Sequence, residues 1–475
     1  MLKIHVLLST TLVVCICSAL SRAGWIGELY NVDPTIMFSD LTYPGAHDAL
    51  TGDLGTEIPY YGDISALARI WPFRHLSSAG AVIRSFSQTQ TTNVTSILNG
   101  GIRLLDLRAV VKERVYDPRC LDGEWYGYHG VVTAKPFQEY IRELSAWTSL
   151  PEHRSEIVIA MVSFHGDNEC VADCWNSIPP ACVKRLFTDT VSSIGPGAIF
   201  NGSQYDILRV GLDALIQSNR RIVLLWSDTR SISSMRYHSL AVDLASTTCQ
   251  DSCTPTLSTG SLKDVPGKKA DLDKSFESLA GVDIPDPRLS IMGLENSILP
   301  CVAKVGALRL FDSRYCLRDT GPAAFGSEWC DGCETCFNMP LKLNGCPWIT
   351  MPSIAALVNY YTQRSLDNVV RNPDRFKFPS ILYQDMVTPT GRVIIDPYNL
   401  TLSAPFTESI ILSNFQRLLP NHTSTMELRA SYDRTRPVQN LPESPGDGIY
   451  AQEGANKWPV SDACVADRSR LAHLP

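Results

Sequence analysis

Residues 102–111 read Ile-Arg-Leu-Leu-Asp-Leu-Arg-Ala-Val-Val, and this stretch decides the fold class that the sequence predicts. Such an apolar run predicts a buried β-strand. Side chains alternate along a strand, so one face carries Ile102, Leu104, Asp106 and Arg108. In an α/β barrel this face would point inward, with the apolar residues at the bottom and the charged pair at the C-terminal mouth. Barrels of that kind place their chemistry at this mouth.

Short apolar runs alternate with amphipathic helical segments along the chain, which predicts parallel strands joined by crossover helices. Further strands are expected at residues 36–43, 126–132, 156–164, 221–226, 289–294 and 378–386. Helices are expected at residues 137–148, 354–361 and 406–418. The first of these strands should end at Pro44-Gly45. Together these elements favour an α/β barrel over a β-sandwich.

The first 23 residues have the features of a secretory signal peptide. Lys3 gives a small positive region, and residues 6–20 form an apolar run that is too short for a comfortable membrane span. Ser21-Arg22-Ala23 predicts cleavage after Ala23, with Ala19 as the alternative. No GPI signal is expected, because the C-terminus lacks a hydrophobic tail. Sequons for N-glycosylation begin at Asn93, Asn201, Asn399 and Asn421, as expected of a secreted glycoprotein.

The composition excludes several classes of protein. The chain has 475 residues, of which 44% are hydrophobic, so it can bury a full core. Its formal charge is −7, and loss of Lys3 and Arg22 with the signal peptide would make it −9. An acidic protein is not expected to bind nucleic acid, nor to be drawn strongly to anionic membranes. We therefore expect apolar side chains to make any contact with lipid.

Thirteen of the fifteen cysteines lie after the signal peptide, and in an oxidising compartment they should mostly form disulfides. The odd count leaves at least one thiol free or bonded between chains. The cluster Cys330, Cys333, Cys336 and Cys346 also has spacing suited to zinc. We predict a barrel domain over residues 24–425, with a Cys-rich insertion at 228–350 and a polar C-terminal tail at 426–475.

Two histidines frame the Asp106–Arg108 strand, and each follows a predicted strand. His47 comes after the Pro-Gly turn, and His129 stands between Tyr128 and Gly130. Two imidazoles that exchange protons near neutral pH, with one fixed cation, can cut a phosphodiester without a metal. Each feature alone also has a structural explanation, as a self-satisfied buried ion pair or a surface-loop histidine. Their joint occurrence at one rim favours catalysis.

These segments resemble the X-domain of phosphatidylinositol-specific phospholipase C (PI-PLC). Leu41-Thr-Tyr-Pro-Gly-Ala-His-Asp48 resembles its opening signature. Residues 90–108, ending Asn-Gly-Gly-Ile-Arg-Leu-Leu-Asp-Leu-Arg, resemble its second block, and Tyr128-His-Gly130 with the strand at 156–164 resembles its third. The resemblance covers residues 36–165 and recurs faintly near 378–386. It implies a distorted TIM-type barrel.

The resemblance also implies roles for individual residues. His47 would be the general base, His129 the general acid, and Arg108 the clamp on the phosphate oxygens. Asp48 would orient His129, and Asp106 would support Arg108. An acid from a late strand would be the partner of the first histidine, and the candidate is Asp385.

The substitution of Arg108 for a carboxylate predicts a site without a catalytic metal. Calcium-dependent members of the family resemble one another in having an Asn after the first histidine and Glu-x-Asp on the second strand. The oxygen atoms of these side chains bind a hard cation. This chain has His47-Asp48 and Asp106-x-Arg108 instead. An arginine repels the cation and replaces it as the phosphate clamp. We expect no cofactor.

Candidate contacts to the head group and to the membrane lie outside the matching segments. Metal-independent members resemble one another in having a basic residue after the fifth strand, but here Trp226-Ser-Asp228 follows. Asp228, with Trp226, could bind a polyol, or Asp228 could be an ordinary loop carboxylate. Trp71 and Phe73 could contact a lipid surface, or could pack on the barrel.

Three functions therefore remain open. The favoured one is a secreted, metal-independent phosphodiesterase of the PI-PLC type, acting on a phosphoinositide or related lipid. A magnesium-dependent glycerophosphodiesterase or sphingomyelinase D-like enzyme is the second. A non-catalytic glycoprotein that binds head groups is the third.

Overall fold

The computed structural model describes residues 22–62, 80–164 without 82, 85 and 86, 178–249, 273–277, 279–280, 288–294, 359–387 without 360, 361 and 364, and 406–435. It also describes the backbone of 392–395 and 400–403. Trp71 and Phe73, most of the Cys-rich insertion, the zinc-like cysteine cluster and the chain after 435 lie outside the described residues. So do residues 1–21 and all but Asn359 of the helix expected at 354–361.

A ten-stranded sheet forms the centre of the molecule, with the strand order β7-β6-β5-β2-β1-β10-β9-β8. These eight strands pair in parallel. They are β1 (Tyr43–Ala46), β2 (Leu104–Val111), β5 (Val158–Phe164), β6 (Ile222–Trp226), β7 (Ala241–Asp243), β8 (Thr248–Cys249), β9 (Leu289–Leu294) and β10 (Ile381–Gln384). The hairpin of β3 (Trp125–His129) and β4 (Val131–Pro136) pairs antiparallel with β2. Separately, β11 (Arg392–Ile395) pairs antiparallel with β12 (Leu400–Ser403).

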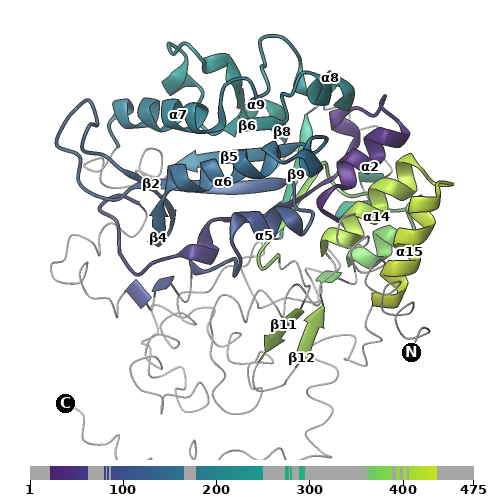
Figure 1. Ribbon diagram of the computed structural model, residues 1–475. Coiled ribbons are helices and arrows are strands. Elements are labelled where there is room, and N and C mark those ends of the chain that lie inside the picture. The colour runs from purple at the N-terminus through teal and green to yellow at the C-terminus, as the bar shows by residue number, and fades with distance from the viewer. Residues whose placement is uncertain are drawn as a thin grey trace, which may run out of the picture.

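The parallel sheet curls round on itself, because its two edge strands are joined by a very short connection. Only α9 (Leu244–Thr247) separates β7 from β8, and four helical residues advance the chain by only about 6 Å. Helices cover the outer face of the sheet, with α6 and α7 beside β5 and β6 in Figure 1. The predicted α/β barrel-like fold is therefore confirmed for this part of the chain.

The described helices connect or flank the strands. They include α2 (Trp25–Val32), α5 (Val94–Asn99), α6 (Phe137–Ser149), α7 (Pro180–Ile194), α8 (Leu212–Gln217), α9, α14 (Phe406–Leu418) and α15 (Thr423–Thr435). None of the helices in the described part of the chain has the length and apolar content that crossing a bilayer requires. α15 continues past residue 426, where the tail was expected to begin, and Tyr432 near its end is buried.

Strand alternation separates two hydrophobic cores. One face of β5 and β6 packs against the helices through Ala160, Leu224 and Trp226. The opposite face packs inside the curl, through Ile159, Val223 and residues of other strands such as Leu104. The inward parity predicted for β2 is therefore correct for Leu104, although Ile102 precedes the strand and packs in the outer core.

The bottom of the curl is closed by α2, which contributes Trp25, Ile26 and Leu29 to the inner core. Trp25 Nε1 donates to Gly101 O at 3.0 Å, just before β2 begins. Figure 1 shows α2, α14 and α15 together at one end of the sheet. The strands run away from this end, so their C-terminal ends form a mouth at the opposite end.

The first strand differs from the prediction. Residues 36–43 were expected to form it, but residues 38–40 form a 3-10 turn whose Asp40 carboxylate accepts from Met37 N at 3.0 Å. β1 instead begins at Tyr43 and includes Pro44 and Gly45, which were expected to stop the strand. The reason is pairing with β10 and β2, two segments that are distant in sequence.

Candidate active site

Strand register places His47, Asp106 and Asp385 in one layer at the mouth. Gly45 aligns with Leu104 on β2 and with Tyr383 on β10, so the positions two residues later face inward together. All three side chains are almost fully buried. The next inward layer contains Arg108, whose side chain is 23% exposed and thus open to a ligand.

Gly45 allows this layering because there is no room for a side chain beneath His47. A Cβ atom at Gly45 would lie 2.5 Å from Tyr383 Cβ and 2.9 Å from Leu104 Cδ2. The Cβ and Cα of Tyr383 occupy this space, and the centroid of the Tyr383 ring lies 5.7 Å from that of His47.

The His47 ring is fixed on both sides. Its Nδ1 lies 2.6 Å from Asp385 Oδ1, and Arg108 Nη2 lies 2.7 Å from its Nε2. In the neutral tautomer, Nδ1–H donates to Asp385 while Nε2 accepts from Arg108. This arrangement leaves the basic nitrogen pointing toward the mouth.

Opposing effects act on the protonation of His47. Burial disfavours the imidazolium, but the Asp48 and Asp385 carboxylates outweigh burial and raise the pKa of His47 to about 10. The positive charge of Arg108 works in the other direction. The 2.7 Å contact with Arg108 fits only the neutral ring, because two N–H donors would otherwise face each other. The contact with Arg108 therefore holds His47 in its neutral form, whereas the two carboxylates favour the protonated form.

Asp48 contacts the other charged groups of the site. Its Oδ1 lies 2.6 Å from Arg108 Nε, and its Oδ2 lies 3.4 Å from His129 Nδ1. Its backbone has φ +45°, in the left-handed region that Asp tolerates better than most residues. Asp106 Oδ2 accepts from Asp48 N at 3.2 Å and lies 3.4 Å from Arg108 Nη2. Burial, and then the negative charge of Asp48, raise the pKa of Asp106 against the lowering effect of Arg108.

His129 faces His47 across the mouth, with the ring centroids 6.4 Å apart. Its closest polar partner is the Ser87 carbonyl, which lies 2.5 Å from Nδ1. Gly130, at φ +73°, allows this approach, since a Cβ there would meet Ser87 Oγ at 2.6 Å. The resemblance implied that Asp48 orients His129, and the structure adds Ser87 as the nearer partner.

Two polar residues that were not predicted hold the ends of β1 and β10. Gln90 Nε2 donates to His47 O at 2.9 Å and to Gln384 O at 3.1 Å. Thr89 Oγ1 donates to His47 O at 3.2 Å. These residues act on backbone carbonyls, so the only sequence signal was that Gln90 begins the second matching block.

The two predicted substrate-binding residues lie at and just after the end of β6. Trp226 is fully buried on the outer face of β6, where its ring packs 5.2 Å from that of Phe187 under α7. Its prediction needs correction, because alternation after inward Leu225 turns Trp226 away from the mouth. Asp228 accepts hydrogen bonds from the Ser231 backbone and hydroxyl within its own turn.

The described residues contain one cluster whose atoms could hold a metal ion: His47, Asp48 and Asp106, with ligand atoms within 4.8 Å of one another. The Arg108 guanidinium lies against all three, at 2.7, 2.6 and 3.4 Å. A cation placed among these ligands would therefore face a fixed positive charge at short range.

The fold and site define a class of α/β protein with a His–Arg–Asp centre at the mouth of a curled parallel sheet.

No family model matches the sequence. Human PI-PLC X domain-containing protein 3 is 31% identical over 139 residues, 29% of this chain and 41% of that protein. Human PI-PLC X domain-containing protein 1 is 29% identical over 179 residues, 37% of this chain and 51% of that protein. The chain thus spans about half or less of the length of these relatives, and over the matched residues it is similar to PI-PLC X domain-containing proteins.

Solved structures with a similar chain course were also found. The phosphatidylinositol-specific phospholipase C of Listeria monocytogenes has a TM-score of 0.43 and 14% identity, covering 82% of this chain and 98% of that one. A mutant of the Staphylococcus aureus enzyme has a TM-score of 0.45 and 12% identity, covering 83% and 98%.

Proposed function

We propose that this protein is a metal-independent phosphodiesterase that cleaves the glycerol–phosphate bond of a phosphoinositide or related lipid. The observation that carries the proposal is the position of Arg108, whose guanidinium contacts His47 and Asp48 at the rim and stays 23% exposed. A phosphate is the ligand that such a planar cation binds best.

The reaction would begin when the phosphate oxygens of the substrate accept hydrogen bonds from the Arg108 guanidinium. This would release His47 Nε2 from its 2.7 Å contact with Arg108. His47 would accept the proton of a neighbouring substrate hydroxyl, whose oxygen attacks phosphorus. The diacylglycerol oxygen leaves and takes a proton from His129, giving diacylglycerol and a cyclic phosphodiester. The 6.4 Å between the two ring centroids is suited to a phosphate placed between them.

Asp385 would hold His47 in the tautomer that the base needs. Its Oδ1 accepts from Nδ1 at 2.6 Å, which keeps the lone pair on Nε2. Asp48 would balance the charge of Arg108 and of protonated His129. Each proton-transfer group should contribute roughly 10²–10⁴ in rate.

The test is cleavage of phosphatidylinositol in vesicles in EDTA, with diacylglycerol and cyclic inositol phosphate as the measured products. His47→Ala and His129→Ala should each lose at least about 100-fold in rate. His238→Ala is the matched control, because this exposed histidine has its hydrogen-bond partner, Met235 O, in its own turn. Retention of full activity in the His47→Ala variant would refute the proposal.

A magnesium-dependent phosphodiesterase is the second candidate, and the His47–Asp48–Asp106 cluster favours it. Arg108 argues against it, because the guanidinium already neutralises the same carboxylates. Activity that disappears in EDTA and returns with magnesium would decide for this second function.

We also propose that the protein is secreted. The N-terminal apolar run and the sequons support this localisation. Within the described residues, Asn93, Asn201 and Asn421 have accessible side chains, as glycosylation requires.

A further inference from the structure

The loop between β2 and β3, residues 112–124, carries an unusual pair of exposed side chains, and we call it the mouth loop. Tyr116 is 77% exposed and Leu121 is 63% exposed. These are the highest values among large hydrophobic side chains of the described residues. Exposed apolar groups of this size mark interaction sites when they gather in one place.

Several bonds hold the mouth loop in this shape. Asp122 Oδ2 accepts from Tyr116 N at 2.8 Å, which brings the two exposed residues to one tip. Cys120 is bonded to Cys182 of α7. Arg185, also on α7, donates to Leu121 O at 3.1 Å. The loop is thus tied to a helix of the barrel, and its tip presents Tyr116 and Leu121 outward without burying either.

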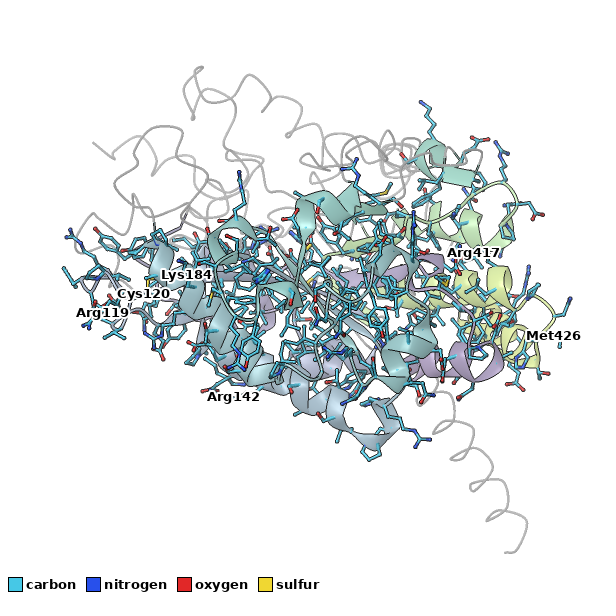
Figure 2. All side chains as sticks on the ribbon, turned by 90° about the horizontal axis from the view of Figure 1, so that it is seen from above. Arg119, Cys120, Arg142, Lys184, Arg417 and Met426 are labelled. Carbon is cyan, nitrogen blue, oxygen red and sulfur yellow. A yellow bond between two sulfur atoms is a disulfide. The ribbon has the colours of Figure 1, made fainter. Side chains whose placement is uncertain are left out.

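The mouth loop lies at the same end of the molecule as the candidate active site. β2 carries Arg108, and the loop begins directly after the same strand ends at Val111. Figure 2 shows Arg119 and Cys120 of the loop at one end, while Met426 of α15 lies at the opposite end. A surface that contacts the tip would therefore face the mouth and not the closed bottom.

The charges of the mouth loop nearly cancel. Its cations are Lys112, Arg114 and Arg119, and its anions are Glu113, Asp117, Asp122 and Glu124. Arg119 pairs with Asp117 at 2.9 Å. Arg114 lies over the rings of Tyr60 and Tyr116, at 5.7 and 5.3 Å from their centroids. Such a surface has no strong preference for anionic lipid, and its apolar tip suits the interface of a zwitterionic bilayer.

We propose that the mouth loop docks the protein on a zwitterionic phospholipid surface, with Tyr116 and Leu121 inserted into the interface. A Tyr side chain can place its apolar ring toward the acyl chains and its hydroxyl among the head groups, which is the orientation favoured at a membrane interface. The disulfide and Arg185 keep the tip extended as it enters. This proposal rests on the proposed function for its lipid substrate, but docking is measured without catalysis.

The test is sedimentation of the full chain with sucrose-loaded phosphatidylcholine vesicles. Tyr116→Ser and Leu121→Ser should each lower the partition coefficient by about tenfold, since each removes an apolar side chain from the interface. Leu150→Ser is the matched control, because Leu150 is 42% exposed at the end of α6 beside the bottom of the barrel. Binding should change little between about 0.05 and 0.5 M salt, because apolar insertion is not screened.

The outcomes separate docking from catalysis. If Tyr116→Ser and Leu121→Ser bind vesicles like the wild type, the lipid proposal is wrong and a protein partner is the alternative. An equal loss in Leu150→Ser would also overturn it. Hydrolysis of a water-soluble phosphodiester should be unchanged in both loop variants. Tip-dependent vesicle binding in a protein that cleaves no phosphodiester would support docking and refute the proposed function.

Discussion

Asp48 shows how one residue organises the candidate site. Its two oxygens reach Arg108 at 2.6 Å and His129 at 3.4 Å, while its backbone sits at φ +45°. A non-glycine residue in this region costs of order 1 kcal/mol and persists where the surroundings fix it. Here Thr51 N donates to Asp48 O at 2.9 Å and Asp106 accepts from Asp48 N, so both sides of the turn are held.

Asp385→Asn should move the pH dependence of the reaction. The general base must lose its proton, so kcat/KM should rise with pH through the raised pKa of His47, toward about 10. Removing the Asp385 charge removes one cause of that raised pKa. The rising limb should therefore shift to lower pH, while the plateau falls roughly 10²–10⁴-fold because the tautomer is no longer fixed.

A pH–rate profile of the two proteins checks this prediction. Asp228→Asn provides the control, since this carboxylate is bonded to Ser231 in its own turn. A rising limb that stays at the same pH in Asp385→Asn would show that the two residues are not linked.

At the scale of elements, the sequence predicted the buried strands and amphipathic helices best. Residues 289–294 were expected to be a strand and form β9 with the same bounds, and 406–418 form α14. Their patterns are local, so one segment is enough to read them. β1 was misplaced because Tyr43-Pro-Gly-Ala46 has little strand propensity of its own and is a strand through its neighbours β2 and β10.

The same distinction applies to the candidate site. The parity of β2 gave Asp106 and Arg108 a common inward face from sequence alone. Asp385 could not be found this way, because it lies 338 residues from His47 and meets it only through sheet pairing. Trp226 was predicted to bind substrate because it follows an apolar run, whereas the alternation of side chains along β6 turns it outward. Strand alternation therefore predicted the inward-facing residues better than position in the sequence did.

Gly45→Ala tests the layering that supports His47. The new Cβ would meet Tyr383 Cβ at 2.5 Å and Leu104 Cδ2 at 2.9 Å, both inside a packed core. We expect a loss of about 1–3 kcal/mol in unfolding free energy, measured by urea denaturation. Gly197→Ala is the control, because nothing lies within 4 Å of a Cβ there. Equal stability of the two variants would show that β10 can move to accommodate the new Cβ, and would contradict the prediction.

At the scale of the whole molecule, the two ends of the barrel differ in the side chains that they carry. The mouth carries the candidate catalytic groups and the exposed mouth loop. The bottom is sealed by α2 and by the fully buried pair of Arg103 and Glu156, whose Nη2 and Oε2 lie 2.7 Å apart. A buried pair of this kind needs all of its remaining donors satisfied. Arg103 donates further to Leu98 O and Ile102 O, at 2.9 and 2.7 Å, and to Ala23 O.

These contacts predict where the mature chain begins if the signal peptide is removed. Cleavage after Ala23 would remove the carbonyl that accepts from Arg103, and also Arg22, whose Nη2 lies 2.7 Å from Glu408 Oε1. It would place a new ammonium group beside the Arg103 guanidinium. Cleavage after Ala19 keeps both contacts. If the protein is secreted as proposed, we therefore expect N-terminal sequencing of the mature chain to start at Leu20.

A direct comparison of two recombinant chains separates processing from stability. The chain that starts at Gly24 should unfold with about 1–3 kcal/mol less free energy than the chain that starts at Leu20, because a charged buried donor loses its acceptor. Arg22→Ala in the longer chain should reproduce only a small part of that loss, since the Arg22 side chain is 34% exposed. Equal stability of the two chains, or a secreted protein that starts at Gly24, would show that the bottom of the barrel is closed by α2 without the residues that precede it.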